Sequence, residues 1–163
     1  MANSKAIGET TEAVILAHLI QRGDSVSLPF GNNQRYDMIV DRRGQLIRAQ
    51  CKTGRLRNGV VLFNACSFNG FTGAERDYRG QADVFLVWCQ ELRTVYELPV
   101  EACGKRMVAL RVNPSRNGQS ARTRIAAAYQ LRCPSLDSNQ DPSRYERAAP
   151  TIELLGRSLN ANA

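Results

Sequence analysis

Asp37, Gln50 and Lys52 are polar side chains in two segments whose neighbours predict buried strands. Residues 36–40 and 46–52 are mostly apolar, and the turn sequence DRRGQ between them predicts a hairpin. Side chains alternate between the two faces of a strand, so Gln50 and Lys52 lie on the same face. The hairpin is therefore expected to bring all three polar side chains together at one end of a sheet.

Such a cluster has the groups that hydrolysis of a phosphodiester needs. A hard divalent cation neutralises charge and lowers the pKa of an attacking water, and Mg²⁺ prefers oxygen ligands. Asp37 and Glu12 would supply carboxylates, and Gln50 a neutral amide oxygen. Lys52 would orient or activate the water and stabilise the charge that develops on the phosphate. The expected cofactor is Mg²⁺, for which Mn²⁺ would substitute.

Glu12 belongs to an amphipathic segment, residues 4–22, whose three/four spacing of apolar residues predicts a helix that ends at Gly23. Glu12 shares a stripe with Leu19, so it is expected to point toward the surface on which the helix packs. Glu9 is the fallback for this position. The competing interpretation places both acids in the first turns of the helix as partners of the helix dipole.

The remaining elements predict an α/β (α+β) fold, a mixed sheet flanked by helices. The run 82–89 is the most apolar and is the expected central strand. A helix is also predicted for residues 120–132. The other expected elements are strands near 26–28, 59–64, 94–100 and 107–112, and a short helical turn at Pro99.

Composition excludes several classes of protein. No run approaches the 18 apolar residues of a membrane span, and no signal peptide is recognised, so no membrane partner is expected. Five cysteines without a C-x-x-C pair favour free thiols in a reducing compartment, cytoplasmic or nucleoid-associated rather than secreted. The single histidine, His18, lies on the apolar stripe of the first helix and is expected to be a core or subunit-contact residue. Zinc sites and histidine-based catalysis are therefore disfavoured.

Positive charge is concentrated in residues 1–133, which hold 19 Lys and Arg against 11 Asp and Glu, whereas residues 134–163 hold 3 against 4. Almost all of it is arginine, whose planar fork suits phosphates and base edges. A generally basic, solvated surface is the alternative interpretation. The residues expected to bind DNA are Arg35, Arg48, Arg55, Arg57, Asn58 and Arg79.

The motif Asp37, twelve residues, then Gln50-Cys51-Lys52 resembles the signature of the PD-(D/E)xK nuclease superfamily. Its junction-resolving members also carry a glycine followed four residues later by a helical acid, as Gly8 and Glu12 do here. The resemblance is closer to the intron-encoded homing endonucleases of this superfamily, across RGDSVSLPFGNNQRYDMIVDRRGQLIRAQCKTGRLRNGVVLF. It implies a restriction-endonuclease-like fold and metal-dependent, sequence-specific cleavage of double-stranded DNA.

Two residues depart from the motif of that superfamily. Tyr36 stands where proline is common, and Gln50 replaces a carboxylate, which removes one negative charge from the metal site. Weaker metal affinity would leave catalysis more dependent on Asp37, Glu12 and the substrate phosphate. The alternatives are a Holliday-junction resolvase and a catalytically dead DNA-binding protein on the same fold. In the plainest interpretation Asp37 is an ordinary acid paired with a nearby arginine.

Residues 1–133 are the expected endonuclease domain, and residues 134–163 a flexible tail. Three pieces of the tail, DSNQ, RYERAA and TIEL, resemble the antisense translation of a transfer-RNA gene. This resemblance suggests a tRNA gene as the target locus. Since a duplex has two strands and one chain carries one site, a homodimer or homotetramer is expected.

Overall fold

The computed structural model describes residues 3–31, 33–68, 73–113 and 123–133. All of them belong to one compact unit, Met1–Cys133. The expected tail, 134–163, lies outside the described residues. In the described part of the chain, no helix is long and apolar enough to cross a membrane.

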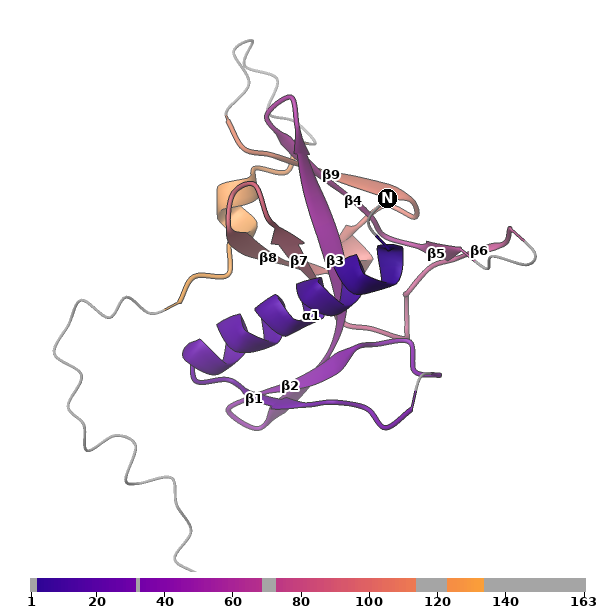
Figure 1. The fold of residues 1–163 in the computed structure, drawn as a ribbon, viewed down its shortest axis with the longest axis vertical. Helices are drawn as coiled ribbons and strands as arrows, with labels where there is room; N and C mark the ends of the chain where they lie inside the picture. Colours follow the sequence, from indigo (N-terminus) through magenta and orange to yellow (C-terminus); the bar gives the residue numbers. More distant parts are fainter. Residues whose placement is uncertain (1–2, 32, 69–72, 114–122, 134–163) are drawn as a thin grey trace, which may run out of the picture. The chain divides into compact units, whose positions relative to one another are not determined.

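The described elements form a mixed sheet with one α-helix, and the α/β prediction is confirmed (Figure 1). In the seven-stranded sheet the order is β1-β2-β3-β4-β9, and β7 joins through β3 and carries β8. The β3–β7 pair is parallel and the others are antiparallel. The elements are α1 Ser4–Gln21, β1 Ser25–Ser27, β2 Met38–Arg42, β3 Gln45–Arg57, β4 Val60–Asn64, β5 Ser67–Phe68, β6 Glu75–Arg76, β7 Val84–Cys89, β8 Thr94–Pro99, β9 Met107–Arg111, and the 3-10 helices η1 Val100–Ala102 and η2 Ala126–Tyr129.

β7 is the central strand, as its apolar sequence predicts, because β3 and β8 pair with its two edges. Successive side chains point to opposite faces, so Phe85 and Val87 enter one hydrophobic cluster and Leu86 enters the other. The second cluster also holds Ile15 and Leu19 of α1. The sheet therefore separates two cores, and α1 covers one of its faces.

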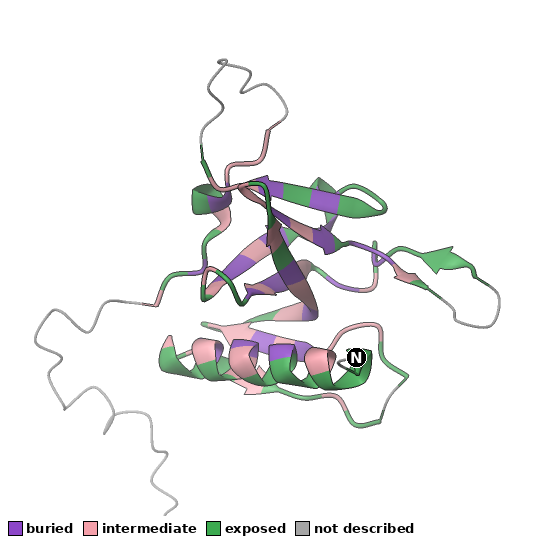
Figure 2. Ribbon diagram, turned by 45° about the horizontal axis from the view of Figure 1, so that its top comes forward, coloured by how far each residue is buried: buried purple, intermediate pink, exposed green. Residues whose placement is uncertain are grey.

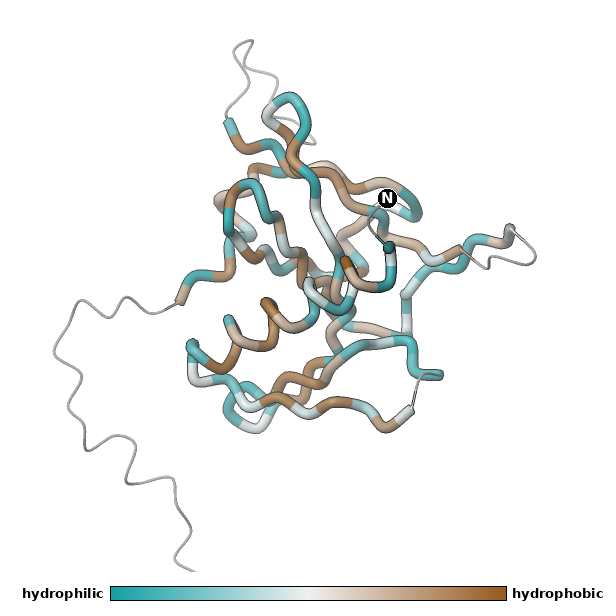
Figure 3. Tube along the Cα trace, in the orientation of Figure 1, coloured by the Kyte–Doolittle hydropathy of each residue, from teal (hydrophilic) through white to brown (hydrophobic). Residues whose placement is uncertain are grey.

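Asn3 caps the start of α1, since its side chain accepts the Lys5 N–H at 3.0 Å, and Arg22 caps the end of the helix just before Gly23, close to the predicted end. Its buried positions follow the expected three/four spacing, and Figure 2 shows the buried stripe on the side facing the sheet. Figure 3 shows the matching hydrophobic stretches in α1 and β2. The first turn contains no acid, and Glu9 and Glu12 lie beyond it. Because the influence of the helix dipole falls off within the first turn, the helix-dipole interpretation of the two acids has no support.

The helix predicted for residues 120–132 is wrong over its described part, where only the short 3-10 helix η2 forms. Both flanks of η2 pair with strands instead. Ile125 forms a bridge with Arg111, and Gln130 forms one with Tyr96. These hydrogen bonds at the sheet edge override the helix propensity of the alanine run. The expectation of flanking helices therefore holds only for α1 among the described residues.

Gly54 is the point at which β3 passes closest to its neighbours. A Cβ added there would lie 2.8 Å from Val61 Cγ1 of β4 and 2.9 Å from Val87 Cγ1 of β7. Real Cβ atoms essentially never approach other atoms so closely. Only glycine therefore lets β3 pass from its pairing with β7 to its pairing with β4.

Gly54→Ala is expected to lower the free energy of unfolding by about 1–3 kcal/mol, because the added methyl overpacks a filled core. Chemical denaturation measures the change. The control is Gly8→Ala in α1, where an added Cβ meets no atom within 4 Å and alanine is favoured by up to about 1 kcal/mol. Equal effects of the two substitutions would contradict the close approach at Gly54.

Candidate active site

Asp37 lies immediately before β2 and holds the edge of β3. Its N–H donates to Ala49 O at 2.9 Å, which extends the hairpin by one step. β2 pairs with β3 only as far as Ala49. Beyond that point Asp37 Oδ2 accepts the Cys51 N–H at 2.7 Å, so the carboxylate replaces the next strand partner.

Gln50 and Lys52 lie beside Asp37 on the face of β3 opposite to α1. Gln50 is 9% exposed, and its Nε2 donates to Asp37 Oδ2 at 2.5 Å. Lys52 Nζ donates to Tyr78 Oη at 2.9 Å, and the Lys52 charge is one of the influences on Asp37. The structure thus brings together the three residues that the hairpin argument selected.

Glu12 approaches the group from α1, on the other face of β3. Burial raises the pKa of the Glu12 carboxyl above its usual value, and repulsion from Asp37 and then from Glu9 raises it further. Glu12 is therefore the helical acid that interacts with Asp37. Glu9, the fallback, forms an exposed ion pair with Lys5 at 3.8 Å.

The pKa of Asp37 is also raised, because burial destabilises the charged carboxylate more than its partners stabilise it. The lowering influences are the Cys51 N–H, the Gln50 amide and the Lys52 charge, in that order. Two carboxyls that repel each other, each with a raised pKa, form a site that a cation would stabilise.

The donor set fits Mg²⁺. Glu12 and Asp37 supply oxygen ligands, and a magnesium ion commonly takes one or two carboxylates with water and substrate phosphate. Among the described residues no group of three or more His, Cys, Asp or Glu side chains lies so that it could hold a metal ion, so two carboxylates are the most that the chain offers here. Gln50 would complete the set through Oε1. The Gln50 amide directs Nε2 toward Asp37, so the amide would have to flip before Oε1 could face a metal ion beside Asp37.

Asp37→Asn is expected to raise the melting temperature of the metal-free protein at neutral pH by a few degrees. Because the folded-state pKa of Asp37 lies above the unfolded value, folding binds a proton between those values. Stability therefore falls as pH rises through that window, and the loss persists above it. Asparagine removes the charge and keeps an acceptor for the Cys51 N–H.

Melting curves measured across pH, without metal, test this expectation. The advantage of Asp37→Asn should grow above the ordinary aspartate pKa and then level off. Mg²⁺ should raise the melting temperature of the unchanged chain more than that of the variant. Asp41→Asn at the opposite end of β2, where Asp41 accepts the Gly44 N–H at 2.8 Å, is the control. An Asp37→Asn variant that is less stable at neutral pH would contradict the argument.

Tyr78 is the site residue that sequence reasoning missed. It lies in the segment before β7, 26 residues from Lys52, and is 5% exposed. Its hydroxyl accepts the Lys52 hydrogen bond, and the Arg35 guanidinium stacks on its ring at 4.4 Å from the centroid. No periodic pattern marks a single tyrosine in a loop, so only the tertiary contact reveals it.

Three of the predicted DNA-binding arginines already have hydrogen-bond or ion-pair partners in the protein. Arg35 donates to Gln81, Ser67 and the Asp77 carbonyl. Arg48 forms a bidentate pair with Asp83, whose carboxylate also accepts the Arg48 N–H at 2.8 Å. Arg79 donates to the Cys103 carbonyl and lies 3.7 Å from Glu101.

Arg55, Arg57 and Asn58 are exposed at the end of the β3–β4 hairpin. The turn of this hairpin lies near the top of Figure 1. Asn58 and Gly59 both have positive φ, 49° and 74°, as a type I′ turn requires. Figure 3 shows this turn as hydrophilic. Within the described residues, Arg55 and Arg57 have no hydrogen-bond or ion-pair partner, and the charge of Arg55 acts only at longer range, on the pKa of Glu91. Both guanidinium groups are therefore available to a ligand.

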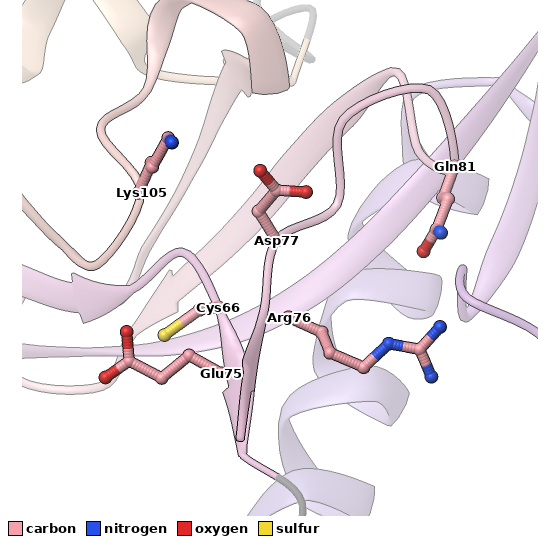
Figure 4. A pocket seen from close by; sticks show the side chains of 6 residues that line it. All are labelled: Cys66, Glu75, Arg76, Asp77, Gln81 and Lys105. Carbon is pink, nitrogen blue, oxygen red and sulfur yellow. The ribbon is translucent and has the colours of Figure 1, made fainter.

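A separate cavity of about 390 Å³ contains none of the candidate catalytic residues (Figure 4). It adjoins the support of Tyr78, since Asp77 and Gln81 both bind Arg35. The candidate catalytic residues therefore lie outside this cavity. The cavity is lined by Cys66, Glu75, Arg76, Asp77, Gln81 and Lys105.

The fold is thus a mixed sheet with a helix over one face, and an acid, an amide and a lysine converge at one strand edge. A family model described as PD-(D/E)XK endonuclease matches residues 2–132. The chain therefore belongs to the PD-(D/E)XK endonuclease family. Nucleases of this family generally use divalent metal ions.

The solved structure of a bacterial homing endonuclease, I-Ssp6803I, is similar to this chain with a TM-score of 0.63. The similarity covers 79% of this chain and 89% of that chain at 20% sequence identity. At this identity it establishes the shared fold. No curated protein matches the chain.

Proposed function

We propose that this protein is a Mg²⁺-dependent, sequence-specific homing endonuclease that cleaves double-stranded DNA. The observation that carries the proposal is the contact of Asp37 with Gln50 on β3, with Lys52 on the same face and Glu12 facing Asp37 from α1. Family membership supports the nuclease chemistry, and the fold of a homing endonuclease supports the biological class. Residues 1–133 would form the nuclease domain.

In the proposed reaction, water attacks phosphorus, one P–O bond forms, and the bond to the leaving sugar oxygen breaks. Asp37, Glu12 and the Gln50 amide oxygen would hold the metal ion, which supplies charge neutralisation and a more acidic water. Lys52 would orient that water and stabilise the negative charge developing on the phosphate. The water loses a proton to solvent, and the leaving oxygen gains one from solvent.

The β3–β4 hairpin supplies a surface for DNA. Arg55 pairs with Leu62, and Arg57 with Val60, so their side chains share the outer face of this hairpin. A two-stranded β-ribbon fits the major groove of B-DNA. Arginine forks can bind phosphates or guanine edges there, and Asn58 at the turn can reach an adenine edge.

Assembly and location follow from the same proposal. Two copies of the site are needed to cut both strands, so we expect a homodimer or homotetramer on a pseudo-palindromic target. The target locus would be a tRNA gene. All five cysteines are free thiols, as expected for a reducing compartment such as the cytoplasm or nucleoid.

Cleavage assays on two substrates test the function. We expect Mg²⁺ or Mn²⁺ to support cutting of a linear duplex that carries a tRNA gene, at one position, with a four-way junction left intact. Preferential cutting of the junction without sequence preference would instead identify a Holliday-junction resolvase.

A catalytically dead DNA-binding protein is the second candidate, and one observation favours it. Gln50 donates an N–H to Asp37 where a carboxylate would present another metal-binding oxygen. Tight, sequence-specific DNA binding with no nicking in either metal would establish this alternative.

A further inference from the structure

We infer that Tyr78 is a positioning residue, which holds the Lys52 ammonium at the active site through its hydroxyl and ring. Lys52 Nζ donates to Tyr78 Oη at 2.9 Å and lies 4.3 Å from the ring centroid. The inference rests on the proposed catalytic role of Lys52. It adds Tyr78, which lies outside the Asp37–Gln50–Lys52 group, as the residue that positions the Lys52 ammonium.

Lys52 needs such an anchor because its side chain is long and flexible. An ammonium on a four-carbon stem has three rotatable donors and samples many positions when it is solvated. A displacement of about 1 Å from the reacting atoms costs up to about 100-fold in rate. The hydrogen bond to Tyr78 restricts the ammonium before substrate arrives.

Tyr78 itself is rigidly held. Its ring is 5% exposed and meets the Phe85 ring edge-on, with centroids 5.6 Å apart and planes at 88°. Its carbonyl accepts the Gln81 and Ala82 N–H groups, both at 3.0 Å, in the turn that leads to β7. A fixed ring places its hydroxyl at a fixed point next to β3.

Arg35 completes the support. Its guanidinium stacks on the Tyr78 ring at 4.4 Å from the centroid. Three acceptors fix that guanidinium: Gln81 Oε1 at 2.6 Å, the Asp77 carbonyl at 2.8 Å and Ser67 Oγ at 2.9 Å. Every donor nitrogen of Arg35 thus has a partner in the protein. The residue that sequence analysis assigned to DNA therefore has a structural task at the active site.

Tyr78→Phe separates positioning from packing, because it removes the hydroxyl and keeps the ring. We expect the single-turnover cleavage rate at saturating DNA to fall about 10- to 100-fold, as for other supporting partners of a catalytic group. The dissociation constant for DNA and the melting temperature should stay unchanged. Tyr96→Phe is the matched control, since Tyr96 is 4% exposed in the same core cluster and has no contact with Lys52 among the described residues.

A second measurement does not depend on cleavage. The chain has only three lysines, Lys5, Lys52 and Lys105, so NMR of lysine labelled at Cε resolves each one. The Tyr78 ring current should displace the Lys52 signal. In Tyr78→Phe the Lys52 signal should move toward the other two, because the ammonium loses the hydroxyl that fixes it beside the ring and samples more positions.

The outcomes are distinct. A rate unchanged by Tyr78→Phe, in a chain that Lys52→Ala inactivates, overturns the positioning role and leaves the nuclease proposal standing. A parallel loss of stability and DNA affinity would also overturn it, by showing a packing role. Absence of a displaced lysine signal in the unchanged chain overturns it directly. An unchanged chain that shows the displaced signal and cuts no DNA would refute the proposed function alone.

Discussion

Lys52→Ala is expected to reduce the single-turnover rate of DNA cleavage by about 100- to 10,000-fold, to near background, while the dissociation constant for DNA stays within about twofold. The reason is that, in the proposed mechanism, Lys52 acts on the transition state. Its charge would stabilise the attacked phosphate, and its position near Asp37 would let it orient the attacking water. Asp37→Ala should have the same effect, because the carboxylate would hold the proposed metal ion, and it accepts the Cys51 N–H of β3.

The measurement is cleavage of a labelled duplex at saturating protein, together with DNA binding in Ca²⁺, which is expected to occupy the proposed site without supporting the reaction. Lys105→Ala is the matched control, since Lys105 lines the separate cavity. A Lys52→Ala variant that cuts at the rate of the unchanged chain would remove Lys52 from the mechanism. Equal losses of affinity and rate would make Lys52 a DNA contact instead.

Replacing Arg55 and Arg57 together by alanine is expected to weaken DNA binding about 10- to 100-fold at physiological salt. Both guanidinium groups are exposed on the outer face of the hairpin, and neither has a hydrogen-bond or ion-pair partner within the described residues. Each phosphate contact releases a counterion. The double variant should therefore reduce the slope of log K against log salt concentration by about two.

Binding measured at several salt concentrations tests this expectation. Arg106→Ala is the control, because the exposed Arg106 already pairs with Glu75 at 2.6 Å. Retained affinity with loss of sequence discrimination would show that the pair reads bases. An unchanged slope and affinity would contradict the hairpin as the DNA-binding surface.

The sequence predicted most of the elements and the convergence of Asp37, Gln50 and Lys52. Helical spacing in residues 4–22 and the apolar run 82–89 predict α1 and the central strand, because periodicity directly reflects which face is buried. The hairpin between Asp37 and Lys52 is local, so its alternation also predicts which side chains meet. These predictions needed no knowledge of distant contacts.

Only the tertiary structure decided the rest. It distinguishes Glu12 from Glu9, engages Arg35 and Arg48 with partners in the protein, and replaces the expected final helix by two strand bridges and a short 3-10 helix. Each of these outcomes depends on residues far apart in the chain, whose hydrogen bonds and charges outweigh local propensity. Tyr78 is the clearest case: nothing in its neighbouring sequence indicates that the fold will place its hydroxyl against Lys52.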